Sequence, residues 1–273
     1  MSKLKLLSVL ALAFAASTQA HNRWILPTHF NVSAEQSGKQ VWIMADVTAS
    51  NETFNVDKPM GSDRFSIIKP SGKEARPGSS FRGHRKSVVD INLPESGTYK
   101  MFLDNDVSYW TSYEMAGSDK RKWMRNVNKA NRDSMLPKGA KNPKTVASSS
   151  QVMTFVTLNE PTDNFALSNQ GLELKPITHP SDIAQNEEVK LQLLFNGKPQ
   201  KGVEVEIIKD GARYRNNPDA LELVSDKKGN ITFTLKDAGR YLLMAEYRTE
   251  KSDNPLADEM GGQIFFTFEA VLN

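Results

Sequence analysis

The most specific chemistry in this sequence belongs to His21, which stands in the run Ala20-His21-Asn22-Arg23-Trp24. If the chain is cut after Ala20, the free α-amine of His21 and its own Nδ1 can close a six-membered chelate ring around one metal ion. The α-amine has an ordinary pKa of about 7.7–8.0, so a metal ion can displace its proton near neutral pH. We therefore predict His21 as a metal ligand, and the alternative is a frayed terminus without a role.

The other candidate ligands are few, because the 273 residues include four histidines and no cysteine. A first-row metal site takes two or three nitrogen donors at about 2.0–2.1 Å, often with a carboxylate. His179 precedes Pro180, which stiffens the backbone, and Asp182, which can orient the imidazole. Asp46 interrupts the end of an apolar strand. We predict that His21, His179 and Asp46 bind one divalent nickel, cobalt or copper ion. A turn histidine and a turn or capping carboxylate are the alternatives for the last two.

The segment before His21 has the three parts of a secretory signal. Lys3 and Lys5 supply a positive start, and Leu6 to Ala16 is an apolar run too short to span a bilayer. Small residues end the segment at Ala20. We predict a signal peptide over residues 1–20, cleavage before His21 and a periplasmic location. An uncleaved anchor is the alternative, and the mature chain has no apolar run long enough for a membrane span.

The composition and the missing motifs exclude several function classes. Once Lys3 and Lys5 leave with the leader, 33 basic residues face 32 acidic ones, so nucleic acid is not an expected partner. The chain has no Gly-x-Ser-x-Gly, no glycine-rich phosphate loop and no His-Glu-x-x-His. We expect a binding protein rather than an enzyme. A local basic run over residues 120–144 fits a solvated surface better than a docking surface for an acidic partner or anionic lipid.

The elements that must position these residues are strands. Period-two patterns and turn signals predict strands over residues 40–47, 64–68, 87–93, 98–103, 152–158, 189–195, 203–209, 231–235, 241–248 and 263–271. This spacing is typical of an all-β protein with two immunoglobulin-like β-sandwich domains in tandem, over residues 21–165 and 166–273. Ser118 to Met135 interrupts the pattern. Ser118 as a cap, with Trp123 and Val127 on one side, predicts a short helical, basic insertion between strands.

Two further patterns concern tyrosines and tryptophans. Gly97-Thr98-Tyr99 and Gly239-Arg240-Tyr241 each open a return strand, which indicates two sandwiches of related design. Tyr109, Trp110, Tyr113 and Trp123 form an aromatic group that could stack on sugars. We expect these rings to pack in a core or between domains instead, because aromatics on strands usually do.

Several short motifs, taken in order over nearly the whole mature chain, carry a resemblance to a known family. They are His21-Asn22-Arg23-Trp24, Leu26-Pro27, Asp46, Ser50-Asn51, Gly97-Thr98-Tyr99, Lys120-Arg121-Lys122-Trp123, Gly171-Leu172-Glu173-Leu174, Thr178-His179-Pro180-Ser181-Asp182 and Gly211-Ala212-Arg213-Tyr214-Arg215. The chain resembles an exported family of unknown function that is grouped with the periplasmic component of cobalt and nickel uptake. The resemblance implies a two-domain β protein that handles transition metals. Many relatives carry histidines in the segment that corresponds to Asn51–Pro59, and this sequence has none there.

Three functions remain open at this level. The first is a periplasmic metal-binding protein in uptake or buffering, with His21 as ligand and with the metal ion and a transport component of the inner or outer membrane as partners. The second is a copper enzyme of the histidine-brace type, which oxidises its substrate. The third is a protein or glycan interaction module in which His21 has no role.

Overall fold

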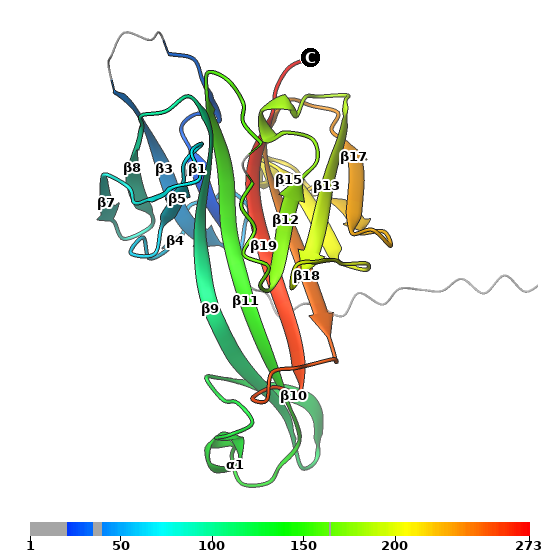
Figure 1. Ribbon diagram of the computed structural model, residues 1–273. Helices are drawn as coiled ribbons and strands as arrows, with labels where there is room; N and C mark the ends of the chain where they lie inside the picture. Colours follow the sequence, from blue (N-terminus) through cyan, green and yellow to red (C-terminus); the bar gives the residue numbers. More distant parts are fainter. Residues whose placement is uncertain (1–20, 35–39, 164) are drawn as a thin grey trace, which may run out of the picture.

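The computed structural model describes residues 21–34, 40–163 and 165–273, and in these ranges the protein is almost entirely β, as predicted (Figure 1). The predicted leader lies outside the described residues. Three sheets form the fold. The first sheet has the order β1 (Asn22–Pro27), β3 (Val41–Ser50), β8 (Ser87–Leu93) and β7 (Ser79–Arg82), with β4 (Lys58–Pro59) paired to β3. The third sheet joins β12 (Leu172–Pro176), β13 (Glu188–Phe195) and β14 (Lys198–Pro199), with β17 (Asn230–Thr234) paired to β13.

The central sheet is the largest and lies between the other two. Its order is β16 (Leu221–Val224), β15 (Glu204–Lys209), β18 (Gly239–Thr249), β19 (Glu259–Ala270), β11 (Ala140–Leu158), β9 (Gly97–Met115), β5 (Ser66–Ile68) and β6 (Glu74–Ala75). Strand β10 (Ser118–Arg125) pairs with β9, and β2 (Asn31–Val32) pairs with β11. The described helices are short: α1 (Arg132–Met135) and the 3-10 turns η1 (Pro180–Asp182) and η2 (Ala212–Tyr214).

Alternation along β11 explains how one sheet serves two hydrophobic cores. Successive strand residues point to opposite faces. Val152 and Val156 are buried in the core under the first sheet, whereas Met153 and Phe155 are buried in the core under the third sheet. Burying one such side chain contributes about 1.5–3 kcal/mol. The cores are therefore two sandwiches that share their middle layer.

The central sheet contains strands from both predicted domains. The strands of the first sheet all precede residue 165 and those of the third sheet all follow it, as the predicted division requires. However, β11 and β19 run parallel and paired from Val146↔Glu259 to Thr154↔Thr267. The two halves thus contribute to one continuous sheet, and the boundary at residues 165 and 166 stays a prediction.

The two Gly-x-Tyr motifs, which begin at Gly97 and Gly239, have the same local structure in both halves. The Tyr99 hydroxyl donates to the carbonyl of Glu95 at 2.6 Å, and the Tyr241 hydroxyl donates to the carbonyl of Asp237 at 2.7 Å. Each hydroxyl reaches four residues back along the chain, across the turn before its strand. This is the tyrosine corner of immunoglobulin-like sandwiches.

The helix predicted to begin at Ser118 is wrong. Residues Ser118–Arg125 form β10, which pairs antiparallel with β9 from Ser118↔Met115 to Arg125↔Trp110. The end of β9 needs a partner for its backbone groups, and this pairing overrides the local spacing that favoured a helix. The helical part of the insertion is α1 alone, at the tip of the long strands (Figure 1).

The long strands extend past the first sheet and leave part of the central sheet uncovered. Strands β9 and β11 have 19 residues each, whereas β1 has six. Among the residues of β11 in the core under the first sheet, Val152 is the nearest to the α1 end of the strand. Beyond that point the same face of β9, β11, β19 and β18 continues toward β10 and α1 (Figure 1). We call this face of the four strands the platform.

Candidate ligand-binding cavity

A cavity of about 1120 Å³ opens where the platform emerges from under the first sheet. Residues far apart in the sequence line it. They include His21, Arg23, Asp63, Arg64, Ser108, Trp110, Trp123, Arg125, Ser148, Ser150, Glu246, Arg248, Gly261 and Gln263. Pockets for small ligands usually measure about 300–1,000 Å³, so this space can take a ligand of several rings.

A β-bulge on β9 brings two of these side chains onto the platform. Val152 faces Leu103 across the ladder, and both lie in the core under the first sheet. The register shifts between Ser150 and Ser148 of β11, after which Ser148 faces Ser108. The shift changes β9 from odd to even residues on that face, so Ser108 and Trp110 point to the platform. Bulges commonly re-aim side chains beside functional sites.

Small residues form the floor of the cavity. The ladder aligns Ser108, Ser148, Gly261 and Arg248 in one row across the four strands. Gly261 presents no side chain, and the serines present only hydroxyls. Gly262 faces the opposite side of the sheet, where an added Cβ would lie 2.7 Å from the Cβ of Leu172. Gly262 therefore serves packing against the third sheet, whereas Gly261 keeps the floor open.

Two tryptophan–arginine pairs form the wall toward α1. The Arg125 guanidinium lies 5.7 Å from the ring centre of Trp110, and the Arg248 guanidinium lies 5.6 Å from that of Trp123. Both tryptophans are 37% exposed, so they are not core residues, although the sequence led us to expect packing. Arg248 also pairs with Glu259 at 2.5 Å. Arg125 takes part in none of the ion pairs found among the described residues.

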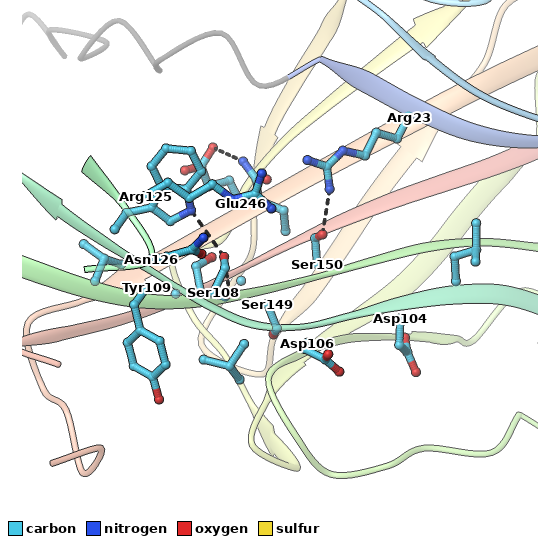
Figure 2. A pocket seen from close by; sticks show the side chains of 18 of the residues that line it. Arg23, Asp104, Asp106, Ser108, Tyr109, Arg125, Asn126, Ser149, Ser150 and Glu246 are labelled. Atoms are coloured by element: carbon cyan, nitrogen blue, oxygen red, sulfur yellow. Dashed lines mark hydrogen bonds between the residues drawn. The ribbon is translucent and has the colours of Figure 1, made fainter. Parts of the chain in front are cut away.

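Arg23 forms the wall on the side of the first sheet. Its Nη1 donates to the hydroxyl of Ser150 at 2.8 Å, and its guanidinium lies 5.6 Å from the ring centre of Phe265. Burial, and secondly the charge of Arg125, lowers the pKa of Arg23. The ion pairs of the described residues include none with Arg23. Figure 2 shows Arg23, Arg125 and Glu246 on one side of the strands, and Tyr109 on the other.

His21 lies on the rim of this cavity, and its Nε2 contacts the ammonium of Lys58. An ammonium can only donate, so Nε2 accepts and the imidazole proton resides on Nδ1. That nitrogen is the one that a chelate with the α-amine would need. The contact with Lys58 must therefore open before His21 could bind a metal ion in this way.

His179 is held by hydrogen bonds far from His21. Its Nδ1 lies 2.6 Å from the hydroxyl of Ser181, and its Nε2 lies 3.1 Å from the hydroxyl of Thr98. Thr98 faces Thr157 of β11, seven residues from the Ser150 that Arg23 contacts, or about 23 Å along the strand. His179 and His21 do not meet.

Asp46 is also apart from His21. It faces Leu26 across the ladder, about 16 Å along β1 from His21. Its carboxylate pairs with Lys86 at 2.8 Å, on the outer face of the first sheet. The described residues contain no group of three or more metal-binding side chains. The predicted set of His21, His179 and Asp46 is thus not assembled, and only His21 remains available for a metal hypothesis.

The basic run is partly neutralised within the structure. Asp258 pairs with Lys129 at 3.4 Å and with Arg132 at 2.8 Å, and Glu114 pairs with Arg121 at 3.2 Å. Asp258, just before β19, also accepts a hydrogen bond from the Thr145 amide of β11 and so holds the α1 segment against that strand, whereas the Glu114–Arg121 pair joins β9 to β10. These contacts favour the solvated-surface interpretation over a dedicated docking surface.

The sequence profile of the family described as "Domain of unknown function (DUF4198)" matches residues 18–249, which is most of the chain. The chain belongs to this family. The matched region contains the first sheet, the third sheet and nearly all residues that line the cavity. No curated protein matches the chain.

Several solved structures are similar at low levels. The "D0-D1 domain of Intimin" is 12% identical, covers 89% of this chain and 96% of its own, and has a TM-score of 0.21. The FN1–FN3 domains of chicken CNTN1 are 8% identical, with coverages of 84% and 94% and a TM-score of 0.24. The tandem V-type regions of VCBP3, a "v-region-containing chitin binding protein", are 9% identical, with coverages of 90% and 99% and a TM-score of 0.19. TM-scores this low carry no argument about this protein.

Sequence reasoning missed most of the cavity. The sequence places Arg23 beside His21 but gives it no role, and no local motif marks the floor residues Ser108, Ser148 and Gly261 as a site. One signal was present: Ser148-Ser149-Ser150 interrupts a strand that is otherwise rich in Val, Phe and Thr, and Gly261-Gly262 lies opposite it in the ladder. No described helix is long and apolar enough to cross a membrane.

Proposed function

We propose that this protein is an exported, non-enzymatic binding module and that its cavity takes a saccharide of several rings. The observation that carries this proposal is the pair of half-exposed tryptophans beside a hydroxyl-lined floor. Trp110 and Trp123 offer apolar ring surface, and Ser148 offers a hydroxyl, whereas the hydroxyls of Ser108 and Ser150 already bond to the Ser148 carbonyl and to Arg23. Amphipathic aromatics combined with small hydrogen-bonding groups suit a ligand whose rings have an apolar face and a polar edge.

The ladder argues against a peptide bound as an added strand. At the floor, β11 is paired with both β9 and β19, and β19 is paired with both β11 and β18. The backbone donors and acceptors of β11 and β19 are already used, so a peptide cannot add as a strand over Ser148 and Gly261 in the middle of the floor. A ligand on the floor must be recognised by side chains.

Intrinsic fluorescence tests the proposal, because two of the four tryptophans line the cavity. A titration with a panel of tri- and tetrasaccharides is expected to change the emission for at least one of them. Trp110→Ala and Trp123→Ala should each weaken binding by about tenfold, or about 1.4 kcal/mol. Trp42→Ala is the matched control, since Trp42 is 51% exposed on the first sheet. Unchanged binding in both cavity variants would contradict the proposal.

Metal capture by His21 is a second candidate, supported by the position of His21 on the rim of the same cavity. Cleavage before His21 would place its α-amine there too, and the amine and Nδ1 would hold nickel, cobalt or copper. His179 and Asp46 are engaged elsewhere, so the structure offers an incomplete donor set. A bound ion would supply a positive charge at the cavity rim. The proposed roles in metal uptake or buffering, and the transport partner, depend on this candidate.

Metal titration of protein with an authentic processed terminus tests this candidate. Submicromolar binding that disappears in a Met-extended form would support it. Equal binding by both forms would show that the terminal His21 is not a ligand. No binding by either form would refute metal binding altogether.

A further inference from the structure

Two arginines in the cavity point to the charge of its ligand. Arg23 is partly buried between Ser150 and the ring of Phe265, and no described carboxylate pairs with it. Arg125 lies over Trp110 and is likewise without a carboxylate partner among the described residues. Removing a cation from water is costly unless an anion compensates it. The partly buried guanidinium of Arg23 is therefore best explained by an anion that binds beside it, and the exposed Arg125 adds a second positive charge to the same cavity.

The protein keeps both guanidinium groups oriented. The Ser150 hydroxyl accepts from Nη1 of Arg23, and the indole of Trp110 lies 5.7 Å from the guanidinium of Arg125. Arginine presents a planar fork of donors that matches a carboxylate, and pre-orientation lowers the entropy lost on binding. Burial, and secondly the charge of Arg125, lowers the pKa of Arg23, as expected for a partly buried guanidinium with a second cation nearby.

The carboxylates that line the cavity limit how much negative charge the ligand can carry. They are Asp63, Asp104, Asp106 and Glu246, of which Asp106 pairs with Arg64 at 2.7 Å. Glu246 lines the cavity in the same row as Ser150 and Gln263, and it accepts a hydrogen bond from Gln263 at 3.3 Å. The carboxylate of Glu246, when ionised, would repel a ligand with many sulfate groups. It would instead accept hydrogen bonds from sugar hydroxyls, as an ionised carboxylate can.

We propose that the ligand is an acidic saccharide with a carboxylate on a sugar ring, held between Arg23 and Arg125 over the floor of Ser148 and Gly261. The neighbouring rings extend along the platform, where Glu246 and Gln263 bind hydroxyls. This inference rests on the proposed saccharide-binding function and adds the chemical class of the ligand.

Calorimetric titration of the purified protein with trigalacturonate and with the neutral galactotriose tests the inference. We expect trigalacturonate to bind at least about tenfold more tightly, with an affinity that falls as salt rises. Arg23→Gln and Arg125→Gln should each reduce that preference by at least about tenfold. Arg82→Gln is the control, because Arg82 is exposed on the edge strand β7.

The outcomes separate this inference from the function on which it rests. Equal binding of the charged and the neutral trisaccharide would overturn the acidic class and leave saccharide binding intact. Binding of neither, nor of any other saccharide, would overturn both. Tighter binding of a sulfated trisaccharide than of trigalacturonate would overturn the assignment to a carboxylate.

A second variant protects the test against misfolding. If Arg23→Gln lowers the melting temperature strongly, Arg23→Lys keeps the charge and loses the planar fork. Trigalacturonate binding weakened severalfold in Arg23→Lys, with the neutral ligand unaffected, supports the inference. Unchanged binding of both ligands in Arg23→Lys and in Arg125→Gln would refute it.

Discussion

Arg23 of the first sheet donates a hydrogen bond of 2.8 Å to the hydroxyl of Ser150 on the central sheet. This contact marks the point where the first sheet stops covering the central one. On one side of it lies the core that contains Val152 and Phe265, and on the other side lies the cavity. Arg23 therefore lies at the boundary between the hydrophobic core and the cavity, and it contacts both.

Filling the floor should block the cavity. Ser148→Phe places a ring between Ser108 and Gly261, where only small groups stand. We expect saccharide binding to fall by about 100-fold, while the free energy of unfolding changes by less than about 1 kcal/mol, since the site is not in a core. Fluorescence titration and urea unfolding measure the two quantities. Ser80→Phe on exposed β7 serves as the control. Retained saccharide binding in Ser148→Phe would contradict the assignment of the floor as the binding surface.

The ion pairs of Asp258 with Lys129 and Arg132 should make the stability of the α1 segment depend on acidic pH. Burial would raise the pKa of Asp258, but a hydrogen bond from the Thr145 amide and the charges of Arg132 and Lys129 outweigh it and lower this pKa. A lowered pKa contributes stability that is present above the ordinary value of 3.8 and is lost as the pH falls below it. Asp258→Asn should cost about 2 kcal/mol at pH 7 and less near pH 3, since the loss begins once the pH falls below 3.8. Urea unfolding at both pH values measures this, and a pH-independent difference would contradict it.

The two tyrosine corners should contribute similarly to the two halves. Tyr99→Phe and Tyr241→Phe each remove a hydrogen bond to a carbonyl and should each cost about 1–2 kcal/mol. Denaturant unfolding measures both. A loss of stability in only one variant would show that the two Gly-x-Tyr motifs do not contribute in the same way.

Tyr99 should also carry a dependence on alkaline pH. Burial raises the pKa of Tyr99 to about 12, above its ordinary value of 10.0. A raised pKa means that the contribution of the neutral hydroxyl is complete below pH 10 and declines as the pH approaches 12. The stability difference between the protein and Tyr99→Phe should therefore narrow between pH 10 and about 12. A constant difference would contradict this assignment.

Lys58 should oppose metal binding at the terminus. Lys58→Met removes the ammonium that contacts Nε2 of His21 and frees the imidazole to place its proton there. If the second candidate function holds, the affinity for nickel or copper should rise by roughly fivefold, or about 1 kcal/mol. Lys86→Met, which removes the partner of Asp46, is the control. A lower metal affinity in Lys58→Met would speak against the assigned tautomer.

Much of the fold could be predicted from the sequence, because strand alternation and turn residues are local signals. The strand predicted over residues 87–93 is β8, and the turn at Asp226–Asn230 is closed by the Asp226 carboxylate. The helix from Ser118 failed because β10 is stabilised by pairing with β9, which the local spacing does not encode.

The cavity depends on relationships that no local pattern contains. It requires the bulge that turns Ser108 and Trp110 onto the platform, and it requires β1 to begin beside Ser150. His179 shows the same limit. Its spacing to Asp182 allowed a metal ligand, whereas its actual partners include Thr98, 81 residues away. Long-range pairing decides which polar residues are left to bind a ligand.

A crystal structure of the protein with trigalacturonate tests the central claim most directly. We expect the trisaccharide on the floor of Ser148 and Gly261, with one carboxylate between Arg23 and Arg125 and with its rings beside Trp110. An ordered trisaccharide on another face of the protein, with this cavity filled only by solvent, would contradict it.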